Sequence, residues 1–360
     1  MTLKKILLFP FAVIYGIITS LRNLLYDWKF LKSKSFDVHT ICVGNLAVGG
    51  TGKTPHVEYL IKLLQNEFKI AILSRGYKRK TTGFIHADSN STALDIGDEP
   101  LQYKTKNPTL DICVDANRVN GVKKILSFPE PPKVIILDDA FQHRALDSEL
   151  KIVVSEYSNL FFNDYMLPAG TLRESKSGIK RADIIIISKT PDKTTAIEIR
   201  NVIKDLKPLA HQQVFFTWLK YGELTGFQNP AETIDTLNDL FRYRIVLFTG
   251  IGNPTPMVTY LKEYASDVKH IQFPDHHQFS IQDIANIRAE LDVFEGGNKI
   301  VITTEKDAMR LKGSDLQDIA NTLPLYVLQI EVDFKDKTQK FNETIINYVR
   351  TSKFYHKKYS

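Results

Sequence analysis

Residues 43 to 54 read Val43-Gly44-Asn45-Leu46-Ala47-Val48-Gly49-Gly50-Thr51-Gly52-Lys53-Thr54, between an apolar run and an amphipathic segment. This order of strand, glycine-rich loop, Lys-Thr and helix is typical of a P-loop, whose backbone N–H groups surround a phosphate. Ala47 stands where the strict pattern has its first glycine, but the positions closest to the phosphate keep theirs. The alternative is a glycine-rich turn without a ligand. We expect a nucleoside triphosphate to bind here, with the Lys53 ammonium on the β- and γ-phosphates, the Thr54 hydroxyl on Mg²⁺, and the remaining contacts from Gly49, Gly50, Thr51 and Gly52.

The composition indicates a globular protein with one large α/β core or two lobes. The chain has 360 residues, of which 43% are hydrophobic. Its only cysteines, Cys42 and Cys113, lie in apolar runs, so neither a disulfide framework nor a cysteine zinc site is expected, and a reducing cytoplasm fits. The net charge of +6 favours acidic partners, among which composition alone does not choose.

A hydrophobic helix is predicted at the N-terminus. The apolar run from Ile6 to Leu21 follows Lys4 and Lys5 and is followed by further basic residues. Sixteen helical residues cover about 24 Å, less than the roughly 30 Å hydrocarbon core of a bilayer. We therefore expect this helix to lie in the membrane interface, where cations meet anionic headgroups; a buried helix and a signal peptide are the alternatives.

Recurring β-branched runs predict a P-loop-type, mostly parallel sheet flanked by helices, with a second, smaller α/β lobe. Residues 213–242 are expected to be extended linker strands, and residues 353–360 a solvated basic tail. The expected organisation is an N-terminal helix at 1–34, a P-loop domain at 35–212, linker strands at 213–243, the smaller lobe at 244–335, and a C-terminal helix and tail at 336–360.

The run Val134-Ile135-Ile136-Leu137-Asp138-Asp139 predicts a second element of the nucleotide site. An apolar strand that ends in carboxylates is what a Walker-B strand needs to hold Mg²⁺ or its waters beside a P-loop. Acids at a strand end also cap helices, but together with a P-loop the metal role is favoured. The sequence leaves open whether Asp138 or Asp139 contacts the ion.

Four further segments are weaker candidates when taken alone. Basic residues after a strand, Arg75 to Lys80, could receive a phosphorylated substrate or be a solvated loop. The acids Asp98 and Glu99 open a helix and could serve only as caps. Asp275-His276-His277 favours proton handling or a polar contact across the cleft over a metal site, with a structural histidine equally favoured. The loops at 167–174 and 303–307 offer Arg173 and mixed charge.

Taken together, these blocks resemble one family. Gly44 to Pro55, Ser74 to Tyr77, Gly97 to Pro100, Leu137 to Arg144, Pro168 to Glu174, Phe273 to His276 and Thr303 to Asp307 occur in the order of the tetraacyldisaccharide 4'-kinases of lipid A synthesis. The resemblance runs from the N-terminal helix to about residue 330. It implies transfer of the γ-phosphoryl group of ATP, with Mg²⁺, to the 4'-hydroxyl of a lipid disaccharide 1-phosphate, giving lipid IVA at the cytoplasmic face of the inner membrane. The expected partners are this lipid and the membrane surface, without nucleic acid; the oligomeric state stays open.

The resemblance also implies roles for single residues. Asp98 matches the candidate base for the sugar hydroxyl, with His276 as its partner and Glu99 nearby, and Lys53 is the third expected catalytic residue. Arg75, His143, Arg144 and Arg173 are expected to contact the sugar or its phosphate.

Two rival functions share the P-loop. A GTPase or metallochaperone-type switch should carry a guanine-reading Asn/Thr-Lys-x-Asp, but Lys189 is followed by an Asp one residue late, at Asp192, and Lys306 by one a residue early, at Asp307. A membrane-bound partition-type ATPase would bind DNA or a protein partner, and no motif argues for that.

Overall fold

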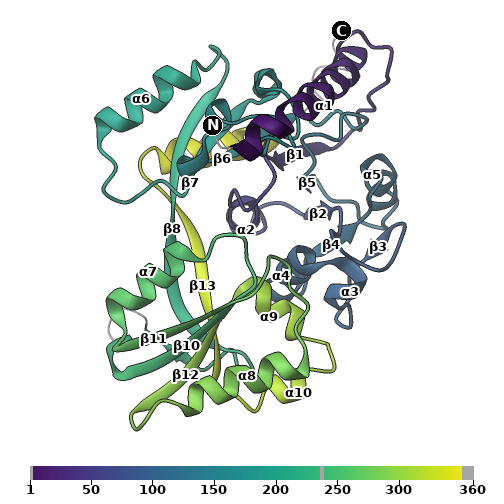
Figure 1. Ribbon diagram of the computed structural model, residues 1–360. Helices are drawn as coiled ribbons and strands as arrows, with labels where there is room; N and C mark the ends of the chain where they lie inside the picture. The colour runs from purple at the N-terminus through teal and green to yellow at the C-terminus, as the bar shows by residue number, and fades with distance from the viewer. Residues whose placement is uncertain (1–2, 236–238, 351–360) are drawn as a thin grey trace.

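A computed structural model describes residues 3–235 and 239–350, so the expected basic tail at 353–360 lies outside the described residues. Figure 1 shows two lobes joined by long strands. The strands are β1 (His39–Gly44), β2 (Ile70–Ser74), β3 (Ile85–His86), β4 (Asp111–Val114), β5 (Val134–Asp138), β6 (Leu150–Glu156), β7 (Ile184–Ser188), β8 (Gln213–Gly226), β9 (Thr233–Ile234), β10 (Tyr243–Thr249), β11 (Asp267–Gln272), β12 (Asn298–Thr304) and β13 (Leu325–Phe334).

Helices lie between most of these strands. They are α1 (Leu3–Asp27), α2 (Lys53–Leu64), α3 (Ala93–Ile96), α4 (Asp98–Lys106), α5 (Arg118–Leu126), α6 (Ala196–Leu206), α7 (Thr255–Tyr264), α8 (Ile281–Asp292), α9 (Glu305–Leu311), α10 (Gln317–Ala320) and α11 (Thr338–Arg350), with short 3₁₀ turns at Tyr157–Asn159, Phe161–Asn163, Lys176–Arg181 and Leu240–Arg242.

The first lobe is built on a parallel run of strands in the order β8-β7-β6-β1-β5-β2-β4, with β3 antiparallel at the edge. All five side chains of β2, β5 and β7 are buried, as expected for parallel strands covered on both faces. In the pairing of β1 with β5, Val43 lies opposite Asp138. The P-loop and the acidic end of β5 therefore emerge at the same edge of the sheet.

Helix α2 is fixed by one apolar face. Val57, Leu60, Ile61 and Leu64 recur at helical spacing and are at most 1% exposed, and the helix packs on β1 and β5. Burial of each such side chain contributes roughly 1.5–3 kcal/mol. This packing anchors the helix whose first turn carries Lys53 and Thr54.

Strand β8 belongs to both lobes. Its first residues pair in parallel with β7 up to Phe216, and from Thr217 onward it pairs antiparallel with β13. Strand β13 continues into the parallel run β13-β12-β10-β11. The region expected to hold linker strands is thus one long strand, β8, followed by the short β9, which pairs back onto it. The domain boundaries stay a prediction.

Helix α1 is longer than the sequence predicted: it covers 25 residues, from Leu3 to Asp27, instead of 16. The helix extends beyond the 16-residue apolar run at both ends, within the expected N-terminal segment 1–34, and its last turn bonds to the body of the protein. Asn23 donates to Glu174 Oε2 (2.9 Å), and Arg144 donates to the Asn23 carbonyl (2.7 Å) and pairs with Asp27 (2.7 Å).

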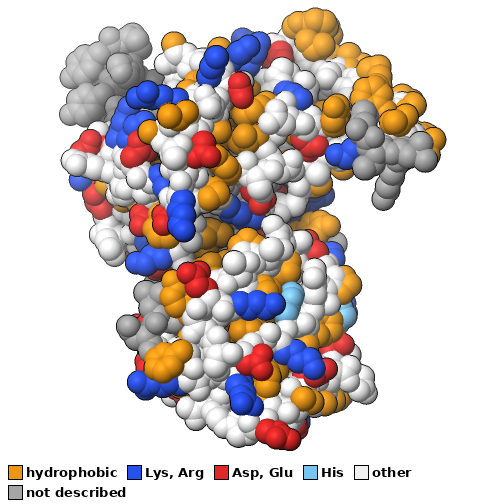
Figure 2. Space-filling model, turned by 60° about the vertical axis from the view of Figure 1, so that its left-hand side comes forward, with side chains coloured by type: hydrophobic (Ala, Val, Ile, Leu, Met, Phe, Trp, Pro, Cys, Tyr) orange, Lys and Arg blue, Asp and Glu red, His pale blue; other side chains and the backbone are white. Residues whose placement is uncertain are grey.

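The other face of α1 is apolar and exposed. Leu7, Phe11, Ile17 and Ile18 are each more than 60% exposed, and hydrophobic side chains gather at the upper right margin of Figure 2, over this helix. Among the described residues, the segment 5–27 is the one helix whose length and composition would suit a membrane span. A signal sequence meets the same criteria, and so does a core helix, although core helices are mostly buried.

Candidate active site

The P-loop runs from the end of β1 to the first turn of α2. Gly52 precedes the helix with a φ of 86°, in the left-handed region that favours glycine. The Asn45 amide donates to Thr51 Oγ1 (3.0 Å), which closes the loop on itself. Lys53 Nζ lies 3.6 Å from Asp139 Oδ1. Lys53, the lysine predicted to bind phosphate, therefore forms an ion pair with one of the two predicted Walker-B acids.

The two acids at the end of β5 have different environments. Asp139 accepts two hydrogen bonds from Arg173, of 2.8 and 3.1 Å. Burial would raise the pKa of Asp139, but Lys53 and Arg173 outweigh it and hold that pKa well below its usual range. Asp138 is fully buried; one of its oxygens accepts from Ser74 (3.1 Å) and the other has no partner. Burial, followed by the charges of Glu99 and Asp139, raises the pKa of Asp138 to about 7.

These groups fit a magnesium ion that a nucleotide helps to hold. Among residues 3–235 and 239–350, no cluster of three or more His, Cys, Asp or Glu side chains could hold a metal alone. Mg²⁺ usually takes only one or two protein carboxylates and completes its shell with phosphates and water. The unpartnered oxygen of Asp138, buried beside other acids, is a group that a cation would stabilise.

Asp98 sits at the start of α4, where two side chains from the second lobe contact it. Its Oδ2 lies 3.3 Å from His276 Nδ1 and accepts from Arg310 Nε at 2.8 Å. Arg310 is itself fixed by Asp307 (2.5 Å) and by the Gly250 carbonyl (3.1 Å). Burial would raise the pKa of Asp98, but the hydrogen bond from His276 and the charge of Arg310 outweigh it, so the pKa is lowered. Asp98 is therefore a charged carboxylate at neutral pH.

His276 Nδ1 has two alternative partners. It can donate to Asp98 or accept from Arg310 Nη2 at 3.4 Å, but one ring nitrogen does not do both at once. The ring also packs edge to face against Tyr77, with centroids 5.4 Å apart. Because Tyr77 comes from the loop after β2, the histidine bridges the two lobes.

Glu99 links this cluster to the P-loop. It pairs with Lys306 at 2.7 Å. Burial would raise the pKa of Glu99, but the charges of Lys306 and Lys53 outweigh it and lower that pKa. Glu99 in turn raises the pKa of Asp138. The first turn of α4 is therefore close to the nucleotide site. Its N-cap residue is Gly97, so Asp98 and Glu99 do not serve as the cap.

The four expected sugar or phosphate contacts fall into two groups. Arg173 lies inside the P-loop site, on Asp139 and Asn45. His143 has a lowered pKa through partial burial and then through the charges of Arg118, Arg75 and Arg22, so these cations share one region next to α1. Arg144 is instead engaged with α1, where its guanidinium also stacks on Tyr26. Of the four, Arg173 is the one whose contacts place it at the P-loop site.

Sequence reasoning did not assign roles to Arg118, Lys306 and Arg310. Arg118 is buried and donates to the carbonyls of Asp115 and Asp138, at 2.9 and 3.0 Å. Lys306 and Arg310 hold Glu99 and Asp98 from α9. For the residues on α9, the sequence offered only the mixed charge at 303–307 after a predicted strand. No sequence pattern pointed to Arg118.

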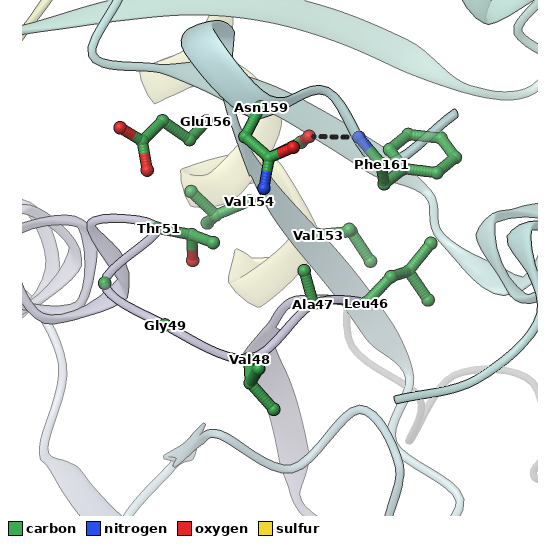
Figure 3. A pocket seen from close by; sticks show the side chains of 12 residues that line it. Leu46, Ala47, Val48, Gly49, Thr51, Val153, Val154, Glu156, Asn159 and Phe161 are labelled. Atoms are coloured by element: carbon green, nitrogen blue, oxygen red, sulfur yellow. Dashed lines mark hydrogen bonds between the residues drawn. The ribbon is translucent and has the colours of Figure 1, made fainter. Parts of the chain in front are cut away.

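A small cavity lies on the other side of the P-loop. It has a volume of about 50 Å³ and is lined by residues 46–51 together with the end of β6 and the following turn (Figure 3). Glu156 at this edge pairs with Lys189 at 3.4 Å. The cavity has room for water beside the loop.

A P-loop with a Walker-B acid, facing a carboxylate held by a histidine and an arginine, defines a phosphotransferase that acts on a hydroxyl group. The tetraacyldisaccharide-1-P 4'-kinase family model matches residues 4–350, and the chain belongs to this family.

Relatives with the name tetraacyldisaccharide 4'-kinase cover nearly the whole chain. The protein of Bacteroides thetaiotaomicron is 44% identical over 352 residues, covering 95% of this chain and 93% of its own. That of Flavobacterium johnsoniae is 44% identical over 351 residues, covering 97% and 98%. A crystal structure of LpxK from Aquifex aeolicus in complex with ATP superposes with a TM-score of 0.73 at 29% identity, covering 96% of this chain and 99% of that one. The family and the fold predicted from the sequence are confirmed.

Proposed function

We propose that this chain transfers the γ-phosphoryl group of ATP to the 4'-hydroxyl of a tetraacyldisaccharide 1-phosphate, giving lipid IVA and ADP. The observation that carries this proposal is the position of Asp98, a partly buried carboxylate at the start of α4 whose neighbour Glu99 interacts electrostatically with Lys53. The names of the family and of its relatives support the substrate.

The proposed chemistry needs one proton acceptor and a cradle for charge. Asp98 takes the proton of the 4'-hydroxyl while the hydroxyl oxygen bonds to the γ-phosphorus. The bond between the γ-phosphorus and the oxygen that bridges it to the β-phosphate breaks, and ADP leaves. Because the transition state of phosphoryl transfer is loose, position matters more than the basicity of the carboxylate. His276 and Arg310 orient Asp98, while Lys53 and the P-loop amides hold the charge that moves to ADP.

Magnesium would be held by the Thr54 hydroxyl and Asp138. Asp139 is less available because Arg173 and Lys53 already occupy it. The ion supplies neutralisation of charge on the β- and γ-phosphates when it is bound.

The lipid is proposed to reach the site from the membrane surface. Each buried CH₂ of an acyl chain contributes about 0.8 kcal/mol, so a tetraacylated sugar does not leave the bilayer. The exposed apolar face of α1 suits that interface, and the cations Arg22 and Arg75 near His143 suit a phosphate of the sugar. We place the protein on the cytoplasmic face of the inner membrane, where ATP is present.

The test is transfer of ³²P from γ-labelled ATP to the lipid disaccharide 1-phosphate in detergent micelles. Wild type is compared with Lys53→Ala and Asp98→Asn. Label in the lipid with wild type alone supports the proposal. Hydrolysis of ATP by wild type without labelled lipid contradicts it and favours a switch or partition ATPase.

A further inference from the structure

One buried imidazole lies directly behind the P-loop. His56, on α2, is 3% exposed. Its Nδ1 lies 2.7 Å from the Gly52 carbonyl oxygen, and its Nε2 lies 3.0 Å from Thr217 Oγ1. Because a carbonyl oxygen only accepts, Nδ1 carries the proton and donates, and in a neutral ring Nε2 accepts from the Thr217 hydroxyl. Burial lowers the pKa of His56 to about 4, which keeps the ring neutral.

These bonds act on the peptide groups of the loop. The carbonyl of Gly52 and the N–H of Lys53 belong to one rigid trans peptide and point in opposite directions. A donor that binds the Gly52 carbonyl therefore turns the Lys53 N–H toward the side of the loop where a phosphate would bind. Ser188, fully buried on β7, does the same for the next peptide by donating to the Thr51 carbonyl at 2.6 Å. Two side chains from behind the loop thus orient two amides that a P-loop turns toward phosphate.

The partner of His56 occupies a special place in the sheet. The pairing of β8 with β7 ends at Phe216, and its pairing with β13 begins at Thr217. Thr217 is 1% exposed, and its carbonyl accepts from the Thr190 amide at 2.8 Å. His56 therefore connects the P-loop to the point where β8 passes from one lobe to the other.

We propose that His56 is a positioning residue for nucleotide binding, which fixes the Gly52 peptide and ties it to Thr217, so that the affinity for ATP depends on the strand shared by the two lobes. A purely structural histidine would contribute to stability and leave ATP affinity unchanged. The inference rests on the proposed role of the P-loop and adds a residue to it.

Four variants separate the two bonds. His56→Leu keeps apolar bulk and removes both bonds. His56→Asn keeps an N–H donor on the atom bonded to Cγ, so it can still hold the Gly52 carbonyl but is too short to reach Thr217. Thr217→Val removes one hydroxyl at nearly constant volume, and Thr217→Ser keeps that hydroxyl as the matched control. Each is measured for melting temperature, for ATP binding by calorimetry, for the KM of ATP and of lipid separately, and for hydrogen exchange of the Gly52 and Lys53 amides.

We expect His56→Leu and Thr217→Val to weaken ATP binding by about fivefold or more, the effect of losing one ordinary hydrogen bond. The KM for lipid should not change. Exchange of the Lys53 amide, which belongs to the Gly52 peptide, should be faster, whereas exchange of the Gly52 amide, held through Ser188, should not change. His56→Asn should lie between His56→Leu and wild type, and Thr217→Ser should match wild type.

A folded His56→Leu protein that binds ATP within about twofold of wild type overturns the proposal. If that variant does not fold, Thr217→Val is decisive. Wild-type affinity for ATP in Thr217→Val overturns the proposal that the hydrogen bond from Thr217 of β8 to His56 supports nucleotide binding. Lys53→Ala separates this inference from the proposed function. Unchanged ATP binding by Lys53→Ala means that the nucleotide site is wrong, whereas loss in Lys53→Ala with none in the His56 and Thr217 variants means that only the positioning role is wrong.

Discussion

The Arg173 guanidinium holds the Asp139 carboxylate with two hydrogen bonds, of 2.8 and 3.1 Å. The adjacent Asp138 keeps one buried oxygen without a partner. The two neighbouring acids therefore differ: Asp139 is paired with the cationic side chains of Arg173 and Lys53, whereas Asp138 keeps an oxygen that accepts no hydrogen bond.

We expect Asp138→Asn to raise the Mg²⁺ concentration needed for half-maximal activity more than Asp139→Asn does. An amide oxygen carries no charge to offset the ion, and loss of a group in a metal site weakens metal affinity by about 10- to 100-fold. The measurement is a titration of lipid kinase activity with Mg²⁺ at saturating ATP. Equal Mg²⁺ titrations for wild type and Asp138→Asn would assign the metal to another group.

We expect Asp98→Asn and His276→Ala to lower kcat and to leave ATP affinity unchanged. Loss of a positioned general base costs about 10²- to 10⁴-fold, and His276 contacts the base while the phosphates lie on the P-loop. Single-turnover transfer and ATP binding are measured side by side. Near-normal turnover in both variants would remove Asp98 from the role of base.

We expect the exposed face of α1 to bind anionic vesicles. Ile17 and Ile18 are 62% and 61% exposed, so charges there should leave the fold intact. Burial of each isoleucine in the interface contributes roughly 1.5–3 kcal/mol, which an aspartate would lose. Sedimentation with anionic phospholipid vesicles should fall for Ile17→Asp/Ile18→Asp and for a chain without residues 1–32.

The matched control is Ile281→Asp, because Ile281 is 63% exposed on α8, in the second lobe. It should sediment like wild type. Continued binding by the chain without residues 1–32 would place the membrane contact elsewhere.

We expect the stability of the fold to fall as the pH rises from about 5 to about 8, in part through Glu305. This residue shares Lys106 with Glu58 in a buried cluster that joins α2, α4 and α9. Burial, and then the charge of Glu58, raises the pKa of Glu305 to about 8. The folded state therefore holds a proton that the unfolded chain releases near its ordinary pKa, so the contribution of Glu305 is complete at low pH and is lost through about pH 8.

The measurement is the melting temperature from pH 5 to 9 for wild type and Glu305→Gln. The glutamine cannot ionise, so the variant should lose less stability over this range. Parallel curves for the two proteins would show that Glu305 does not titrate in this window.

The contiguous parts of the site could be predicted from the sequence. Strand, glycines and Lys53 follow one another along the chain, and the apolar run before Asp138 is a local pattern, so residue spacing alone places both at a strand end. The apolar run from Ile6 to Leu21 underestimated the length of α1, whose last turn includes residues that bond to distant parts of the chain, such as Asn23 to Glu174.

What the sequence by itself determined is the class of the fold and the position of the phosphate loop, since both depend on neighbours along the chain. Only the tertiary structure decided that Asp139 is paired with Arg173 and that Asp138 keeps one oxygen without a partner. Arg173 is 34 residues from Asp139, and Arg310 and His276 are 212 and 178 residues from Asp98. Such contacts follow from the packing of two lobes and not from local spacing, because a side chain's charge and position are set by whatever the fold places beside it.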